Sequence, residues 1–275
     1  MTVGKYSSLI VALLAPLLLT SCFLTPGKFT SELEIDADGS FAFTYEGEIY
    51  MLGFQNLMKA GAKEEEASFT GKCFEDDGMT ARDCSAEEVA EQLEAKKAEN
   101  AQMMAMFGSM FGGIDPASPD GIAEFVSRLE KQKGWHRIVH RGDGIFDIAY
   151  SMEGQLDRNF SFPELEKVQG ITPFVVAIVR KDRAIRIDAP GFATEQNGSS
   201  LAMLSAMSGM GDAGKPADMG PIPVPDGVFR IVTNADILTN NTEEGPTVEG
   251  RNMRALRWVI NQRTKAPPEA LIKLD

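Results

Sequence analysis

The chain has few of the residues and motifs from which catalytic sites are usually built. Only two histidines and three cysteines occur among its 275 residues. No G-x-S-x-G elbow, Walker loop, H-E-x-x-H or dinucleotide-binding fingerprint is present. Carboxylate pairs such as Asp143 and Asp147 leave a carboxylate-dependent hydrolase as an alternative, although such pairs carry little information in a chain with 40 acidic residues. The sequence therefore favours a protein that is not an enzyme.

The two histidines do not have the spacing of a metal site. His136 and His140 could chelate an ion if they lay one turn apart on a helix. Gly134 and the turn Gly142-Asp143-Gly144 instead predict a strand, on which residues four apart are separated by about 13 Å. We expect them to be surface residues of a hairpin.

An acidic turn near the N-terminus resembles the start of a calcium loop. Asp36-Ala37-Asp38-Gly39-Ser40 has the right opening, but the sixth and twelfth positions are Phe41 and Gly47. An EF-hand needs Gly and Glu there. We therefore predict a β-turn, no metal ligands and no cofactor.

Basic residues are outnumbered by acidic ones. The chain has 27 Lys and Arg against 40 Asp and Glu, a formal net charge of −13. Nucleic-acid binding requires basic surfaces that neutralise phosphates, so we expect no nucleic-acid partner. One basic cluster fits either a solvated face or a patch facing anionic lipid headgroups. It consists of Arg128, Lys131, Lys133, Arg137 and Arg141.

The apolar run near the N-terminus is too short to cross a membrane. It covers the 11 residues from Leu9 to Leu19 and is interrupted by Pro16, whereas a spanning helix needs about 20. The run ends in Leu19-Thr20-Ser21-Cys22, which resembles the bacterial lipobox. In a lipobox, an aliphatic residue and two small residues precede the cysteine that receives diacylglycerol. We predict that residues 1–21 are a cleaved lipoprotein signal peptide and that Cys22 is lipidated.

Lipidation would hold the chain in the bacterial envelope, facing the periplasm. The residue after the cysteine is Phe23 rather than Asp, which in Gram-negative lipoproteins implies sorting to the outer membrane. We predict a lipidated tether at 22–28 and a single envelope domain at 29–275. An ordinary secretory signal with an incidental cysteine is the alternative.

The other two cysteines form an even pair. With Cys22 lipidated, Cys73 and Cys84 remain in an oxidising compartment, which predicts a disulfide. Ten residues separate them, so they are not a catalytic CxxC pair. A structural role is predicted.

Alternating polar and apolar residues predict an antiparallel sheet. Ser40–Leu52 has this period-two pattern, and Thr30–Ile35 precedes it across the turn at 36–39. Further strands are predicted at 135–140, 145–152, 174–179, 184–188, 228–233, 254–260 and 270–274. Because few helices separate them, we do not expect a parallel crossover fold. The predicted class is α+β, with one large, mostly antiparallel, curved sheet and two or three helices.

Two helix starts are marked by capping residues. Ser85-Ala86-Glu87-Glu88 is a capping box and predicts a helix that runs to about Phe107. A second helix is predicted to begin at Ser118-Pro119 and to stop at Gly134. Its apolar face is formed by Ile122, Phe125, Val126 and Leu129.

Two Met- and Gly-rich segments, 101–119 and 201–225, interrupt the regular pattern. Methionine is flexible and polarisable, so such segments suit apolar partners of variable shape. They can serve as core, as mobile loops, as a lid over an acyl chain or as a membrane contact. A Cu(I) site is a further alternative because thioethers are soft ligands. The candidate contact residues are Met103, Met104, Phe107, Met110, Phe111, Met203, Met207 and Met210.

Four segments of the C-terminal third follow one another in a recognisable order. Gly227-Val228-Phe229-Arg230-Ile231-Val232-Thr233-Asn234 precedes Asn240-Asn241, Leu256-Arg257-Trp258-Val259 and Ile272-Lys273-Leu274. This order resembles that of LppM-like envelope lipoproteins. The opening of the chain, with Leu33-Glu34-Ile35 and Asp38-Gly39-Ser40 after Cys22, is also similar. The resemblance implies a lipid-anchored α/β domain that contacts lipids or glycolipids. Together with the lipobox, it supports a non-enzymatic lipoprotein that binds a lipid, a glycolipid or an envelope protein.

Overall fold

Strands dominate the fold. The computed structural model describes residues 24–51, 69, 71–75, 80–110, 112–114, 118–142, 144–166, 168, 171–194, 224–250 and 252–275. The described helices are α3 (Ala86–Met110), α4 (Pro119–Glu130) and the short 3-10 helix η2 (Pro190–Phe192). The predicted α+β class is confirmed.

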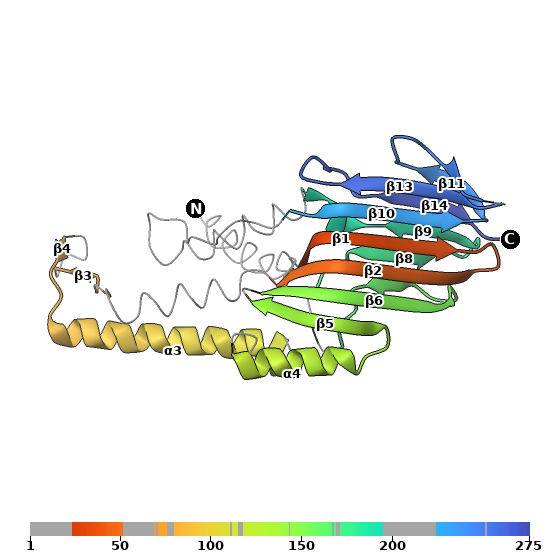
Figure 1. Cartoon of the computed structure of the whole chain (residues 1–275). Helices are drawn as coiled ribbons and strands as arrows, with labels where there is room; N and C mark the ends of the chain where they lie inside the picture. Colours follow the sequence, from red (N-terminus) through yellow and green to blue (C-terminus); the bar gives the residue numbers. More distant parts are fainter. Residues whose placement is uncertain are drawn as a thin grey trace, which may run out of the picture.

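The strands form two large sheets and one small ribbon (Figure 1). In spatial order, the seven-stranded sheet contains β12 (Thr247–Val248), β13 (Arg254–Ile260), β10 (Asp226–Thr233), β1 (Leu24–Ile35), β2 (Ser40–Met51), β6 (Ile145–Gln155) and β5 (Trp135–Gly142). The five-stranded sheet contains β11 (Asp236–Asn240), β14 (Glu269–Lys273), β9 (Ala184–Asp188), β8 (Val175–Val179) and β7 (Phe160–Phe162). The ribbon pairs β3 (Cys73–Phe74) with β4 (Ala81–Arg82). The seven-stranded sheet agrees with the predicted large, mostly antiparallel sheet, whereas the five-stranded sheet is not predicted by the sequence.

The five-stranded sheet covers the apolar face of the long strands in the seven-stranded sheet. In β2, Phe43 and Tyr45 are fully buried while Thr44 and Glu46 alternate with them and are exposed. Phe162 of β7 meets this face, and its ring lies 5.0 Å from those of Phe43 and Tyr45. The space between the sheets is thus filled by aromatic side chains.

One strand pair departs from the antiparallel pattern. Among the described strands, all pairs are antiparallel except β1 and β10, which run parallel. Phe29 of β1 lies between Gly47 of β2 and Gly227 of β10. A Cβ atom on Gly227 would lie 2.1 Å from the carbonyl oxygen of Phe29, and one on Gly47 would lie 2.2 Å from that of Lys28. Only glycine allows both neighbours to approach β1 at this point.

The tether predicted at 22–28 is wrong from Leu24 onward. β1 begins at Leu24, and the side chains of Leu24 and Thr25 are only 4% and 3% exposed. Pro26 and Gly27 suggested a loop, but a register shift between Pro26 and Phe29 accommodates them within the strand. β1 therefore begins two residues after Cys22.

α4 begins and packs as its sequence predicts. Ser118 caps it by accepting a hydrogen bond from the backbone N–H of Gly121 at 3.0 Å. Phe125 and Leu129 are buried, and the ring of Phe125 lies edge-on to Phe146 of β6 at 6.1 Å. α4 thereby covers the β5 end of the seven-stranded sheet.

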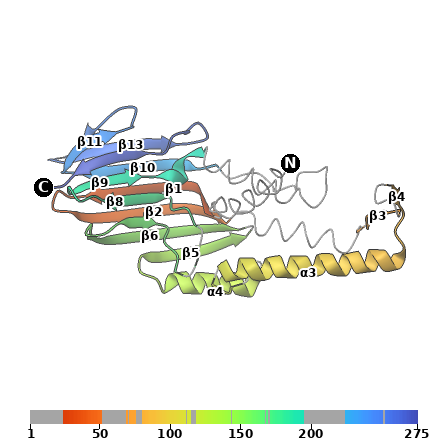
Figure 2. The ribbon, with the colours of Figure 1, turned by 180° about the vertical axis from the view of Figure 1, so that it is seen from behind.

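α3 projects away from the two sheets. It leaves their end and has the β3–β4 ribbon at its far tip (Figures 1 and 2). The capping box is confirmed, since Ser85 N–H donates to Glu88 at 2.8 Å and Glu88 N–H donates to the Ser85 hydroxyl at 3.2 Å. No described helix has both the length and the apolarity to cross a membrane.

Candidate binding groove

The outer face of the seven-stranded sheet carries a groove of about 610 Å³. Two adjacent cross-strand rows line it, Val228–Thr30–Glu46–Ala149 and Arg230–Glu32–Thr44–Ser151. Side chains on this face point away from the five-stranded sheet because successive residues of a strand face opposite sides. Alanine, serine, threonine and valine make a shallow floor, since their side chains are short.

A β-bulge places a histidine at one end of the groove. The register between β5 and β6 shifts between Trp135 and Arg137, so His136 and Arg137 are both exposed instead of alternating. Nε2 of His136 lies 2.6 Å from the hydroxyl oxygen of Ser151. Gly134, at φ +95°, allows the approach, since a Cβ atom there would lie 2.6 Å from the ring of Tyr150.

An ion-pair network closes the other end. Arg230 donates to Glu32 at 2.6 Å and also pairs with Glu249. Hydrogen bonding to Glu249 raises the pKa of Arg230, so the guanidinium stays charged and remains paired with the two glutamates. With Glu32 and Glu46 in the lining, carboxylates outnumber the single arginine. The groove therefore disfavours phosphate and suits hydroxyl or amine groups.

Tyr150 lies beneath the floor of the groove. Its ring packs edge-on to Trp135 at 5.3 Å and lies 4.7 Å from Phe162. Burial, with a smaller contribution from Glu164, raises the pKa of Tyr150 to about 12. Its hydroxyl is therefore protonated over the physiological range.

The Ser151–His136 pair resembles a nucleophile and its base, but the surroundings do not complete a catalytic site. A catalytic pair also needs a group that orients the base and donors that stabilise an oxyanion. Within the described residues, the only hydrogen bond of the His136 ring is the one to Ser151. The Ser151 amide already donates to Gly134 O at 2.9 Å. The pair is better suited to holding a polar ligand.

The histidines lie on a strand, as the sequence predicts. His136 is exposed in the groove, whereas the ring of His140 packs 4.9 Å from that of Phe146. No group of three or more His, Cys, Asp or Glu side chains able to hold a metal occurs in the described parts of the chain. The 36–40 segment is a turn, as predicted, with Ser40 donating to Asp38 at 2.7 Å through its hydroxyl.

Two residues of the predicted basic cluster are paired with carboxylates. Arg128 pairs with Glu124 at 2.6 Å, and Arg141 pairs with Asp147. Both bases are therefore largely neutralised. Asp143, the partner suggested for Asp147 in a carboxylate pair, lies outside the described residues.

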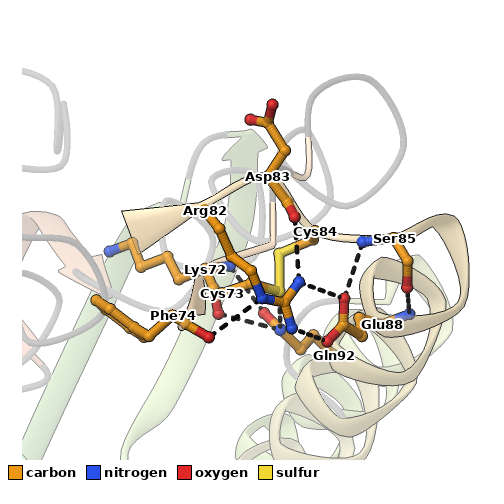
Figure 3. Close-up of a disulfide and its surroundings, with 9 residues drawn as sticks. All are labelled: Lys72, Cys73, Phe74, Arg82, Asp83, Cys84, Ser85, Glu88 and Gln92. Carbon is orange, nitrogen blue, oxygen red and sulfur yellow. Dashed lines mark hydrogen bonds and ion pairs between the residues drawn. A yellow bond between two sulfur atoms is a disulfide. The ribbon is translucent and has the colours of Figure 1, made fainter. Parts of the chain in front are cut away.

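The predicted disulfide is present at the tip of α3. Cys73 and Cys84 are bonded, with Cα atoms 5.3 Å apart. Figure 3 shows the Gln92 side chain of α3 reaching the ribbon, where it accepts from Lys72 N–H at 3.0 Å and donates to Lys72 O at 3.2 Å. The disulfide and this amide together hold the ribbon on the first turns of the helix.

Removing both cysteines should loosen the ribbon without affecting the sheets. The cross-link joins residues 11 apart, so Cys73→Ser with Cys84→Ser should cost the ribbon about 2–3 kcal/mol. Limited proteolysis should then cut near residues 73–84 faster, while the thermal unfolding midpoint of the sheets stays unchanged. An equal fall in that midpoint would contradict this independence.

Arg82 joins the ribbon to the start of α3 through an ion pair and hydrogen bonds. Arg82 donates to Glu88 at 2.5 and 2.9 Å and to Phe74 O at 3.2 Å (Figure 3). The hydrogen bond from Arg82, followed by those from Ser85, lowers the pKa of Glu88 from 4.5 to about 2. The charged carboxylate thus links the ribbon, the helix cap and the loop between them.

Glu88 should titrate with a midpoint near pH 2 in the folded chain. Because folding lowers the pKa of Glu88, its contribution to folding stability is complete above pH 4.5 and is lost as the pH falls toward 2. Carboxyl carbon NMR measures the midpoint, which Arg82→Gln should raise. Lys97→Gln, which removes the partner of Glu94 instead, should leave it unchanged. A native midpoint near 4.5 would refute the network.

Most other predicted site residues fall outside what the structure describes. Cys22, Phe111, Met203, Met207 and Met210 lie outside the described residues. The backbone positions of four more lie in the C-terminal half of α3, but their side chains are not described. These are Met103, Met104, Phe107 and Met110. The contact role of the Met-rich candidates and the Cu(I) alternative therefore stay predictions.

The sequence did contain a signal for the groove. Thr30, Thr44, Ala149 and Ser151 are short residues at outward positions of three neighbouring strands. Period-two patterns identify such positions, but strand order is needed to show that they adjoin. For His136 the sequence predicts only a surface position, because a bulge is not visible in a regular pattern.

Comparison with models of known protein families gives no match, and a search of the curated proteins gives none either. The likeness to LppM-like lipoproteins therefore depends on the sequence segments alone.

Proposed function

We propose that this chain is a lipoprotein of the bacterial outer membrane, anchored through a lipid on Cys22 and facing the periplasm. The lipobox ending at Cys22 supports the anchor. The Cys73–Cys84 disulfide supports an oxidising compartment outside the cytosol. The absence of an acidic residue after Cys22 supports outer-membrane sorting.

The bound ligand is the sugar headgroup of a glycolipid. The observation that carries this proposal is the lining of the groove, where the hydroxyls of Thr30, Thr44 and Ser151 lie beside Glu46 and His136. Hydroxyl and imidazole groups can donate to and accept from the many hydroxyls of a sugar, and a carboxylate accepts from them. The excess of carboxylates over arginine disfavours the phosphate of an anionic phospholipid.

The acyl chains of such a lipid do not belong between the sheets. Phe43, Tyr45, Phe162 and Phe174 are fully buried there. Their rings lie 5.0 to 6.0 Å from one another in the contacts that join the two sheets. The acyl chains would stay in the membrane while the headgroup enters the groove. This is a non-enzymatic role, consistent with the incomplete surroundings of the Ser151–His136 pair.

Blocking the groove should abolish glycolipid binding. Residues 24–275 contain every described strand, so this soluble chain can be mixed with phosphatidylcholine vesicles that carry a glycosyl diacylglycerol. Thr44→Trp places a large ring at the centre of the floor and should weaken co-sedimentation at least about tenfold, equivalent to about 1.4 kcal/mol.

Two controls distinguish the groove from general adhesion. Val139→Trp changes an exposed residue of β5 that does not line the groove, and it should bind as the native chain does. Vesicles with phosphatidylglycerol in place of the glycolipid should bind weakly. Equal binding to both vesicle types, or no loss in Thr44→Trp, would reject the headgroup proposal.

A further inference from the structure

β1 begins only two residues after Cys22, the proposed site of the lipid anchor. Leu24 and Thr25 are already buried in the strand. Two residues of extended chain span at most about 7 Å, so Leu24 must lie within that distance of Cys22. If Cys22 carries the lipid, as the proposed function requires, this end of the sheets is held at the bilayer surface.

Strand register identifies what else lies at that end. Leu24 pairs with Met51 at the end of β2, and Lys28 pairs with Asp226 at the start of β10. The Met51 N–H donates to Gly144 O at 2.7 Å, which adds the start of β6. We call these residues the anchor end. The turn at 36–39 and the chain terminus, where Asp275 N–H donates to Ala37 O, form the opposite end.

α3 extends beyond the anchor end. Figures 1 and 2 show that the helix runs along the direction of the strands and that most of it, with the β3–β4 ribbon, lies past the start of β1. Its 25 residues correspond to a length of about 37 Å. The helix therefore reaches well past the point at which the lipid attaches.

The composition of this arm excludes insertion into the bilayer. Its outer part carries exposed charges, including Glu87, Glu91, Glu94 and Lys97. Charged side chains are costly in the hydrocarbon region, and no described helix is apolar enough to cross it. A protein standing upright on its anchor end would have to drive this arm through the membrane.

We infer that the anchored protein lies on its side, with its strands and α3 along the bilayer surface. The membrane that holds the lipid anchor therefore contacts the protein along the length of its strands and of α3. In this orientation the arm remains among water and headgroups, where its charges are solvated. The exposed ring of Phe74, half accessible at the ribbon, suits the headgroup region, where aromatic side chains are favoured.

The orientation can be measured on the full lipidated chain. A fluorescent amino acid is incorporated at Asp226, Asp38 or Ala81, which mark the anchor end, the opposite end and the ribbon. The protein is reconstituted in phosphatidylcholine vesicles with a headgroup-labelled acceptor lipid. Lying flat predicts similar energy transfer at all three positions. Standing upright would place Asp38 about 40 Å farther from the surface than the start of β1, given 12 residues of strand, and would nearly abolish its transfer.

A linker variant provides the matched control. Inserting a long Gly-Ser linker between Phe23 and Leu24 removes the constraint, so transfer at all three sites should fall together. Loss of transfer at Asp38 alone in the native chain would overturn the orientation while leaving the anchor intact. Failure of the chain to acquire a lipid, seen in its mass, would overturn both the orientation and the proposed anchor.

Discussion

Phe162→Ala should destabilise the protein by about 3–5 kcal/mol. Phe162 has no exposed surface, and its ring lies within 5.0 Å of the rings of Phe43, Tyr45 and Tyr150. Removing it opens a cavity where the two sheets meet, and the rigid neighbouring rings cannot close it. Urea unfolding of residues 24–275 should show a lower midpoint with an unchanged slope.

A surface phenylalanine provides the control for this measurement. Phe74 is 50% exposed in the ribbon at the tip of α3, so Phe74→Ala should change the stability of the sheets by less than about 0.5 kcal/mol. If the two substitutions had equal effects, the aromatic layer would not be the main source of cohesion between the sheets.

Gly227→Ala should cost about 3 kcal/mol, near the upper end of what overpacking produces. The new Cβ atom would lie 2.1 Å from the carbonyl oxygen of Phe29. That oxygen belongs to the backbone and cannot rotate away, so β1 and β10 must separate. Because this is the parallel pair that joins β10 to the rest of the sheet, thermal unfolding should show a large fall in the midpoint.

Gly108→Ala is the matched control for this glycine substitution. Its Cβ atom would lie 3.5 Å from the nearest atom, an ordinary contact, in helix α3. Alanine favours helix over glycine, so the variant should be as stable as the native chain or slightly more stable. A native-like midpoint for Gly227→Ala would mean that the close approach at Phe29 is not a constraint.

Local features of the fold could be predicted because their causes are local. The Ser85–Glu88 capping box, the Ser118 cap and the alternation of Phe43 with Thr44 each depend on neighbouring residues. The division into two sheets could not be predicted, since it depends on which strands pair across long separations. β7 carries too few residues for a periodic signal, and β11 has no fully buried residue that would produce one.

The groove as a whole could not be predicted from the sequence for a related reason. Thr30, Thr44 and Ser151 come from three strands that are brought together only by register. The bulge at His136 depends on Gly134, whose positive φ a pattern of polar and apolar residues does not reveal. The predicted tether is wrong from Leu24 onward because the loop propensity of Pro26 and Gly27 is overridden by the packing of Leu24 and Phe29.

The lipid on Cys22 is the central claim of this account, since the glycolipid role and the flat orientation both depend on it. Expressing the full chain in a Gram-negative host and measuring the intact mass of the membrane-extracted protein tests it most directly. The predicted result is a chain that begins at Cys22 and carries diacylglycerol and an amide-linked acyl group, both lost in Cys22→Ser. A chain cleaved elsewhere, or one beginning at an unmodified Cys22 and recovered free in the periplasm, would contradict it.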